Sequence, residues 1–505
     1  MTIEARKYQA FYTKSTPIVD YMVRKLKLKL SDKILEPCGG NGVFVEAILN
    51  ENEFASIDVC ELNPSAIATL QNKFSNYKNV NVRECDTLTD DELNFNSNFG
   101  GYYDKIIANP PYGAWQDLEK KVILKKMYSG LYAKESYTLF LFRCIELLKE
   151  NGILTFIIPD TFLNLHSHKA IRKHILTKTR VLELALFPSS YFPGVNFGYA
   201  NLSIITLQKT FNQMECLNNS FNVFTDFSAV EQLSNIQENE LKIYSFSQKE
   251  ILSNPDYAFL ISDNANIALT INNTKLKIGD IAHCVTGFYS GDDKIFLQVL
   301  DPTTLKNGKN YGSVDTNAIS KEYKNIPTIL DGIENEKHFV PIVKGGNVKY
   351  LKQEGWFMNW SKETVLHYKK DKKARFQNSK YYFRFGIGVP MISSSSITAS
   401  LIENKLFDQS IVGIFPKDED LTYFLLAFFN SNTCNKLIRT INPSANNPAN
   451  YIKKIPFIEP TTTDKMKIDN LVKIILSNIA FVGHYEGQLL IETEINEIFA
   501  TIYGF

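Results

Sequence analysis

The tetrapeptide Asn109-Pro110-Pro111-Tyr112 combines residue types that suit the activation of an amine. The nitrogen of an exocyclic aromatic amine is a poor nucleophile because its lone pair is delocalised into the ring. Two acceptors for its N–H bonds, the amide oxygen of Asn109 and the backbone carbonyl of Pro110, would draw this nitrogen toward tetrahedral geometry. Consecutive prolines fix the backbone φ there, and Tyr112 offers a flat face for an aromatic base. The alternative is that the tetrapeptide is only a rigid turn.

The residues before this tetrapeptide predict a parallel sheet whose strands alternate with helices. The apolar runs that predict strands lie at residues 33–36, 54–61, 80–85 and 103–107. The first run leads into Gly39, Gly40 and Gly42 and then into a helix, which makes a turn where backbone can approach a ligand closely. Such a glycine turn is a weak signal by itself, because many α/β folds use one for structural reasons.

Polar side chains follow three successive predicted strands. Glu61 lies about twenty residues beyond the glycines, where dinucleotide-type folds place an acid on ribose hydroxyls. The alternative for Glu61 is an acid that complements the dipole of the following helix. Asp86 follows the third strand and Asn109 the fourth. Because ligands bind at the carboxyl ends of such strands, we expect these three side chains at one edge of the sheet.

The elements on either side extend this pattern. A helix is predicted from Pro17 to about Leu26, with Ser15 or Thr16 as its cap and a hydroxyl-rich loop before it. The later predicted elements are a helix at 135–149, a strand at 153–158, a helix at 168–176, and strands at 181–187 and 202–207. The last two strands are joined by a turn that projects Tyr191 and Phe192. The whole pattern predicts a doubly wound sheet.

These motifs, in this order, resemble a known enzyme family. The glycine motif at residues 36–42, the acids Glu61 and Asp86, the tetrapeptide at 109–112 and the upstream segment at 11–17 are similar to those of the gamma class of N6-adenine DNA methyltransferases. This class belongs to type II restriction–modification systems and is represented by the TaqI methyltransferase. The resemblance implies a class I S-adenosylmethionine-dependent methyltransferase fold, Rossmann-like, followed by a C-terminal α+β domain that recognises DNA.

The resemblance also implies roles for individual residues. Asn109 and Pro110 would bind the target amine, while Tyr112 and Phe192 would stack on the two sides of a flipped-out adenine. S-adenosyl-L-methionine would be the cofactor. Its implied contacts are Thr13 or Thr16 at the methionine end, Glu36, Cys38, Gly40 and Asn109 along the pocket, Glu61 at the ribose and Asp86 at the adenine amino group. No metal ligand is expected.

The second half of the chain has a different character. Helix–strand alternation fades after Lys209, and Asn, Gln and Ser accumulate. We therefore predict a catalytic domain at 1–210, a linker at 211–255 and a DNA-recognition domain at 256–505. Four looser motifs resemble the specificity region of the same methyltransferases, at residues 285–294, 341–345, 407–410 and 421–455. The candidate phosphate contacts are Lys344, Lys349, Lys369, Lys370, Lys372, Lys373, Arg375 and Lys380.

Composition limits the remaining possibilities. The formal net charge is only +1, so a basic surface must come from uneven distribution, and the stretch at 120–126 is one locally basic example. The seven cysteines are scattered and form no Cys-x-x-Cys pair, which favours reduced thiols in a cytoplasmic protein. His166, His168 and His174 are interpreted as surface residues. There is no signal peptide and no apolar run of eighteen residues, so no membrane association is expected.

The sequence therefore predicts a site-specific DNA adenine-N6 methyltransferase, the modification enzyme of a restriction–modification system. Its partners would be double-stranded DNA and a cognate restriction endonuclease, and it would act as a monomer. One alternative is a protein-glutamine N5 methyltransferase, because a glutamine amide nitrogen needs the same two acceptors. A second is a non-catalytic DNA-binding specificity protein. A fused restriction–methylation enzyme would need a nuclease motif of paired acids and a lysine, and we find none.

Overall fold

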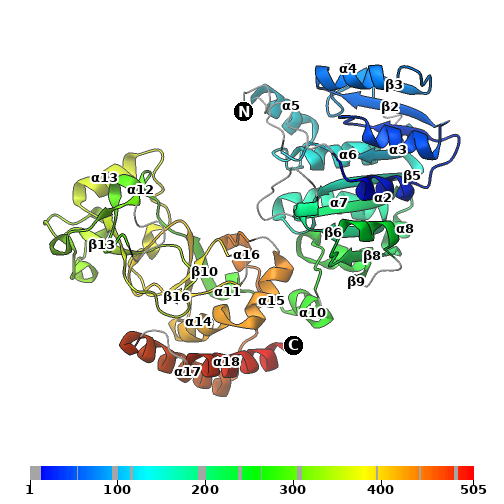
Figure 1. The fold of residues 1–505 in the computed structure, drawn as a ribbon. Coiled ribbons are helices and arrows are strands. Elements are labelled where there is room, and N and C mark those ends of the chain that lie inside the picture. The colour runs from blue at the N-terminus through cyan, green and yellow to red at the C-terminus, as the bar shows by residue number, and fades with distance from the viewer. Residues whose placement is uncertain are drawn as a thin grey trace. The chain divides into compact units, whose positions relative to one another are not determined.

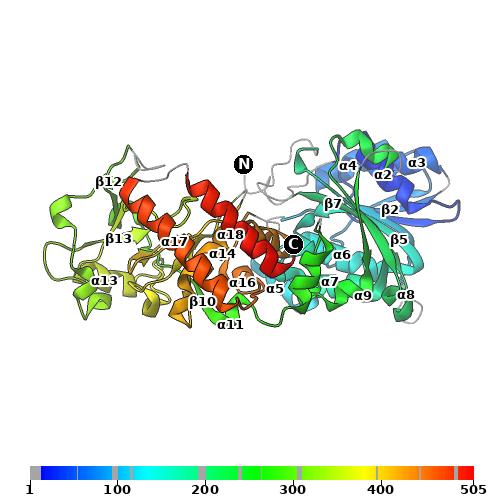
Figure 2. The same ribbon diagram turned by 90° about the horizontal axis from the view of Figure 1, so that it is seen from below.

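The computed structural model divides the chain into two compact units, residues 1–261 and residues 262–505, which Figures 1 and 2 show in two views. The residues that the structure describes are 13–53, 55–93, 101–113, 118–191, 201–236, 241–262, 264–303, 310–393, 396–442, 445–482 and 487–505. Among them, no helix is long and apolar enough to cross a membrane.

Unit 1 is built on a nine-stranded sheet with the order β3-β2-β1-β4-β5-β7-β6-β8-β9. Strands β1 to β5 are parallel, and β7 is inserted antiparallel between β5 and β6. The strands are β1 (Lys33–Glu36), β2 (Ser56–Glu61), β3 (Val80–Glu84), β4 (Tyr103–Ala108), β5 (Leu148–Pro159), β6 (Thr179–Phe187), β7 (Leu202–Lys209), β8 (Ser220–Thr225) and β9 (Lys242–Ser247). The predicted doubly wound sheet is confirmed.

Helices cover this sheet on both sides. Figure 2 shows α2, α3 and α4 on one face and α6 and α7 on the other. The helices of unit 1 are α2 (Thr16–Leu26), α3 (Val43–Glu51), α4 (Pro64–Lys73), α5 (Leu118–Met127), α6 (Ser136–Leu147), α7 (Lys169–Lys178), α8 (Gln213–Leu217) and α9 (Gln248–Ser253). Because both faces are covered, the central strands are almost continuously apolar, as in the fully buried Ile106, Ile107 and Ala108 of β4.

Strands β8 and β9, which belong to this sheet, lie within residues 211–255, so the described part of this range is not the predicted linker. β8 pairs parallel with β6, and β9 pairs antiparallel with β8. The segment is further fixed by the buried Gln248, whose amide nitrogen donates to the carbonyls of Leu176 and Thr179. The sequence did not predict these two strands. They lie near the edge of the sheet, so their exposed positions carry polar residues, and these residues suggested a linker.

In the described residues, unit 2 contains an antiparallel sheet, a mixed sheet and a group of C-terminal helices, which gives it the predicted α+β character. The sheets have the orders β10-β18-β15-β16 and β12-β11-β14-β13-β17. The strands are β10 (Ala282–Thr286), β11 (Leu297–Val299), β12 (Gly312–Ser313), β13 (Phe339–Val343), β14 (Trp356–Asn359), β15 (Ile387–Pro390), β16 (Ser400–Leu401), β17 (Leu406–Phe407) and β18 (Ile411–Pro416).

The helices of unit 2 include a pair close to the C-terminus, α17 and α18. They are α10 (Ala265–Asn273), α11 (Ile278–Ile281), α12 (Asp293–Phe296), α13 (Lys362–Lys370), α14 (Thr422–Asn430), α15 (Asn432–Ile441), α16 (Ala449–Ile452), α17 (Thr462–Val482) and α18 (Gly487–Tyr503). The last helix is tied to the rest of the unit through Glu492, which forms an ion pair with Lys349.

Three of the four loose motifs of unit 2 meet in space. The backbone N–H of Phe288 donates to the carbonyl of Phe407 at 2.8 Å. The ammonium of Lys344 lies 2.7 Å from a carboxylate oxygen of Asp293 and 3.0 Å from one of Asp408. Although burial alone would lower it, the pKa of Lys344 is raised, because the charges of these two aspartates favour the ammonium form. Lys344 therefore holds three segments together inside the unit.

Candidate active site at the carboxyl edge of the sheet

Asn109 lies directly after β4, in the middle of the sheet, and contacts two other predicted site residues. Its amide nitrogen donates to the hydroxyl of Thr13 at 3.1 Å. Its backbone carbonyl accepts a hydrogen bond from the thiol of Cys38 at 3.4 Å. Three segments that are distant in the sequence therefore meet at Asn109: the residues before α2, the glycine turn and the tetrapeptide. The bond to Thr13 fixes the plane of the Asn109 amide.

The structure separates the two threonines that sequence reasoning left open. Thr13 is 3% exposed and bonded to Asn109, whereas Thr16 is the exposed first residue of α2. We therefore expect Thr13→Val to slow the reaction of this site about tenfold. The change removes one hydrogen bond to Asn109, a residue whose side chain must be held in place. Thr16→Ala should leave the rate within about twofold of wild type. Steady-state rates of the two variants test this, and equal losses would contradict it.

The rest of the tetrapeptide is held by α6 and β5. The hydroxyl of Ser136, the first residue of α6, donates to the carbonyl of Pro111 at 2.5 Å. Tyr112 is 6% exposed, its hydroxyl donates to the carbonyl of Ile157 at 3.4 Å, and its ring meets that of Tyr137 edge-on. Burial raises the pKa of the Tyr112 phenol well above its usual value, so this group stays neutral. Sequence reasoning missed Ser136, because one serine at a helix start carries no signal.

The glycine turn is closed by Glu61, the last residue of β2. One carboxylate oxygen accepts from the backbone N–H of Gly40 at 2.7 Å, and the other accepts from Leu62 and Asn63 at 2.7 and 2.8 Å. Glu61 therefore joins the end of β2 to the turn that follows β1. The sequence analysis proposed Glu61 either as a ribose ligand or as an acid that complements a helix dipole, and both place it at this edge of the sheet. The structure adds that Glu61 fixes the glycine turn.

The residues around the turn fit a nucleoside cofactor. Gly40 and Gly42 have φ values of +53° and +74°, and a Cβ on Gly39 would lie 2.4 Å from Val59. Glu36 is 1% exposed, and its Oε2 has no hydrogen-bond partner in the described structure. Burial and then the charge of Glu61 raise the pKa of Glu36 well above its usual value. A buried carboxyl of this kind suits a ligand that brings a hydrogen-bond donor.

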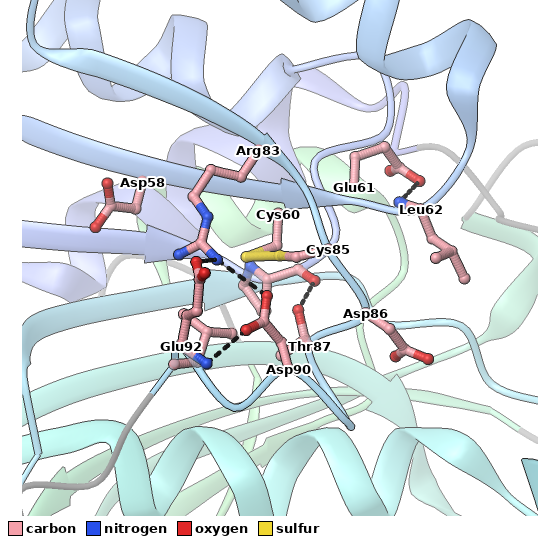
Figure 3. The surroundings of a disulfide bond; sticks show 12 residues. Asp58, Cys60, Glu61, Leu62, Arg83, Cys85, Asp86, Thr87, Asp90 and Glu92 are labelled. Carbon is pink, nitrogen blue, oxygen red and sulfur yellow. Dashed lines mark hydrogen bonds and ion pairs between the residues drawn. A yellow bond between two sulfur atoms is a disulfide. The ribbon is translucent and has the colours of Figure 1, made fainter.

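Asp86 is located at the end of β3 and contacts a lysine that sequence reasoning did not assign to the site. Its Oδ2 lies 2.5 Å from the ammonium of Lys120, in α5. Figure 3 shows Asp86 beyond the end of β3, next to Cys85. A cofactor that bonds to Asp86 would share this carboxylate with Lys120. The only sequence signal for Lys120 was its place in the basic stretch at 120–126.

Next to these two acids, Cys60 of β2 is bonded to Cys85 as a disulfide (Figure 3). The expectation that every cysteine is a reduced thiol is therefore wrong for this pair, while the other five cysteines are free. The two residues are 25 positions apart in the sequence, but β2 and β3 pair in register from Ile57 and Val80 to Glu61 and Glu84. This pairing brings their side chains together at the strand ends, which spacing alone did not reveal.

Two other predicted features have different outcomes. Phe192 lies outside the described residues, so its stacking role stays a prediction. The interpretation of His168 as a surface residue is wrong: it is 1% exposed, with Nε2 2.8 Å from Glu135 and 3.3 Å from the hydroxyl of Tyr137. Its ring therefore supports Tyr137, which in turn packs against Tyr112. Within the described part of the chain, no group of three or more His, Cys, Asp or Glu residues is placed to hold a metal ion.

Asp160 is a further acid at this edge, directly after β5, and it gives a pH-dependent prediction. Burial raises its pKa to about 7, despite hydrogen bonds from Asn201 that lower it. The folded state therefore holds its proton more tightly than the unfolded state, and stability is lost as pH rises from about 4 through 7. Asp160→Asn should gain stability relative to wild type between pH 5 and pH 8, by up to about 4 kcal/mol. Thermal unfolding at several pH values tests this, and a constant difference would contradict it.

Comparisons with known proteins show likeness in sequence and in fold. Residues 20–192 match the family model described as the Eco57I restriction-modification methylase. This range holds the glycine turn, Glu61, Asp86 and the tetrapeptide. The matched range thus covers most of the sheet and the predicted site residues from Glu36 to Phe192.

Relatives with established names are similar over parts of the chain. The type II methyltransferase M.AccI of Acinetobacter calcoaceticus is 28% identical over 270 residues, which are 50% of this chain and 49% of the relative. The adenine-specific methyltransferase BrxX of Escherichia coli O9:H4 (strain HS) is 24% identical over 369 residues, 71% of this chain and 28% of the relative. The chain therefore spans about half the length of the first relative and less of the second.

One solved structure shows how far the fold is shared. A nuclease-deletion mutant of the Type ISP restriction-modification enzyme LlaGI, in complex with a DNA substrate mimic, matches 93% of this chain and 55% of that chain. The TM-score is 0.57 at 12% sequence identity, so the likeness concerns the fold. The fold implied by the sequence, a class I S-adenosylmethionine-dependent methyltransferase fold with a second α+β unit, is confirmed.

Proposed function

We propose that this protein is a site-specific DNA adenine-N6 methyltransferase, which transfers a methyl group from S-adenosyl-L-methionine to an adenine flipped out of duplex DNA. The observation that carries the proposal is the convergence at Asn109. Its amide is bonded to Thr13 and its carbonyl to Cys38, so the amine-binding tetrapeptide borders the turn proposed for the cofactor. The adenine specificity in the name of the relative BrxX supports the choice of base.

The proposed mechanism relies on positioning. The cofactor supplies an electrophilic methyl group on its sulfonium. Asn109 and the carbonyl of Pro110 accept the two N6–H bonds of the adenine and so make its lone pair available for in-line attack. Ser136 fixes the adjoining carbonyl of Pro111, which keeps the two prolines in place before the base arrives. After transfer, the extra proton on N6 passes to solvent, and no strongly shifted base is required.

The cofactor would lie along the edge formed by β1, β2 and β3. Among the described residues, one oxygen of Glu61 accepts a hydrogen bond from the N–H of Gly40 alone. Because a carboxylate oxygen can accept more than one hydrogen bond, this oxygen would also accept from a ribose hydroxyl. Asp86 would accept from the adenine amino group of the cofactor, in competition with Lys120. Thr13 and the buried Glu36 would meet its methionine end.

The base itself must leave the duplex, which costs about a few kcal/mol. Tyr112 is the proposed stacking partner, with Phe192 on the other side. Because Tyr112 is largely covered in the described structure, the base would have to replace part of its present cover. Stacking returns roughly 1–3 kcal/mol for each aromatic contact.

Unit 2 is the proposed recognition unit, but its basic residues differ from the sequence expectation. Lys344, Lys349 and Lys369 pair with carboxylates inside the unit. We therefore no longer propose these three lysines as phosphate contacts. Lys344 and Lys349 have a structural role, and Lys369 forms a surface ion pair. The remaining candidates for phosphate contact are Lys370, Lys372, Lys373, Arg375 and Lys380.

The proposed setting is the cytoplasm, with the protein acting as a monomer beside a cognate endonuclease. The main alternative is a protein-glutamine N5 methyltransferase. A second unit of the size of residues 262–505 favours DNA, because methylation of a glutamine side chain requires no recognition of a base within a duplex.

Purified protein with labelled cofactor tests the proposal directly. Label should appear in duplex DNA that contains the recognition site, so long natural DNA is the substrate to use while that site is unknown. Label in protein or in tRNA, with none in DNA, would overturn the proposal.

A further inference from the structure

Helix α5 is attached to unit 1 along one narrow face. This face consists of Lys120, Leu124 and Tyr128, which are spaced at every fourth residue and so point the same way. Lys120 pairs with Asp86, Leu124 is fully buried, and the hydroxyl of Tyr128, one residue beyond the helix, donates to the carbonyl of Leu88 at 2.7 Å. In Figures 1 and 2, α5 lies at the border of unit 1.

The opposite face of α5 is both basic and apolar. Lys121, Lys125 and Lys126 are exposed, and no ion pair within the described part of the chain involves them. Val122 is 66% exposed, Ile123 44% and Met127 47%. We call the six residues Lys121, Val122, Ile123, Lys125, Lys126 and Met127 the outer face of α5.

An ordinary solvated helix does not account for this outer face. A surface helix usually mixes charges of both signs, and its large apolar residues point inward. Here lysine fills four of the ten positions of α5 and glutamate one, in a chain whose total charge is only +1. The local excess of positive charge therefore suits a polyanion, and the apolar side chains between the lysines suit contact with its sugar surfaces.

The position of α5 indicates that such a polyanion would lie near the carboxyl edge of the sheet. The helix follows the tetrapeptide that ends at Tyr112, and its first turn contacts Asp86 at the same edge of the sheet. Gly130, shortly after α5, has a φ of +90°, and a Cβ added there would meet no atom within 4 Å. This left-handed backbone conformation turns the chain away from the helix. The outer face is therefore carried by a helix that begins and is anchored beside the proposed base and cofactor sites.

We propose that the outer face of α5 binds the sugar–phosphate backbone of duplex DNA beside the flipped adenine, with Lys121, Lys125 and Lys126 on the phosphates. This inference rests on the proposed function. It assigns DNA contacts to the catalytic unit itself, in addition to those of the recognition unit. Contacts of this kind fix the position of the duplex without reading its sequence.

The test is duplex binding by the full chain with Lys121, Lys125 and Lys126 all changed to Gln. The probe is a fluorescent duplex of mixed sequence, because backbone contacts do not need the recognition site. We expect the dissociation constant at about 0.1 M salt to rise by about tenfold or more, and the slope of log affinity against log salt to fall by about 2–3. Binding of labelled cofactor and the melting temperature should stay unchanged.

A matched control is the triple change of Lys173, Lys178 and Lys249 to Gln. These exposed lysines also belong to helices of unit 1, α7 and α9, and two of them lie near the amino end of β6, away from the site. The control should bind DNA like wild type. Equal losses in both triple variants, or no loss in the α5 variant, would overturn the inference.

Other outcomes separate the inference from the proposed function. A lower melting temperature in the α5 variant, with DNA affinity kept, would mean that the outer face packs against protein and would overturn the inference alone. Wild-type protein that methylates no DNA yet loses duplex affinity in the α5 variant would overturn the proposed reaction and support the contact.

Discussion

Replacing Asn109 by alanine should lower the rate of methyl transfer to DNA by about a hundredfold to a thousandfold. The change removes one of the two acceptors that would prepare the amine, and single groups of this kind are worth roughly 10²–10³ in rate. It also leaves the hydroxyl of Thr13 without its 3.1 Å bond. Cofactor binding should change little, because the turn is held by Glu61 and not by Asn109. Single-turnover transfer and equilibrium binding of labelled cofactor measure the two effects separately.

The control for Asn109 is Asn164→Ala, a buried asparagine of unit 1 whose side chain faces the backbone of Leu163 and Phe259. It should lose stability without a selective loss of the chemical step. If Asn109→Ala transferred methyl groups within about tenfold of wild type, the proposed activation of the amine would be wrong.

Replacing Lys344 by methionine should destabilise unit 2 by about 3 kcal/mol, because it leaves the charges of Asp293 and Asp408 together in a largely buried site. The side chain of Asp408 is only 3% exposed, so water cannot compensate for the lost partner. Unfolding by urea, followed by the fluorescence of Trp356 and Trp360 in the same unit, measures the loss.

Two variants sharpen this test. Lys369→Met breaks an ion pair with Asp331, which is 66% exposed, and should cost no more than about 0.5 kcal/mol. The triple change Lys344→Met, Asp293→Asn and Asp408→Asn should recover part of the lost stability, since no unpaired charge remains. A Lys344→Met protein that stayed as stable as wild type but bound DNA more weakly would instead restore the original prediction of a phosphate contact.

The parts of the fold that the sequence predicted are those with strong local patterns. The central strands β1, β4, β5 and β7 are almost entirely buried, so their residue types alone mark them, and the acids and amide at the ends of β2, β3 and β4 follow directly. Strands β8 and β9 lie at the sheet edge, where exposed positions accept polar residues, and they looked like a linker.

Within the candidate site, the sequence predicted which residues gather but not how they contact one another. The bond from Asn109 to Thr13, the pairing of Lys120 with Asp86 and the support of Pro111 by Ser136 join residues far apart in the chain. The same is true of Cys60 with Cys85 and of Lys344 with its two aspartates. Such pairs depend on strand register and helix placement, which no local pattern encodes.

The most direct test of the account is single-molecule sequencing of DNA from cells that express the protein, set against DNA from cells that express Asn109→Ala. It reports the modified base, the modified atom and the surrounding sequence together. The account predicts N6-methyladenine at one recurring sequence in the first sample and none at that sequence in the second. Methylation at cytosine, or DNA identical in the two samples, would contradict it.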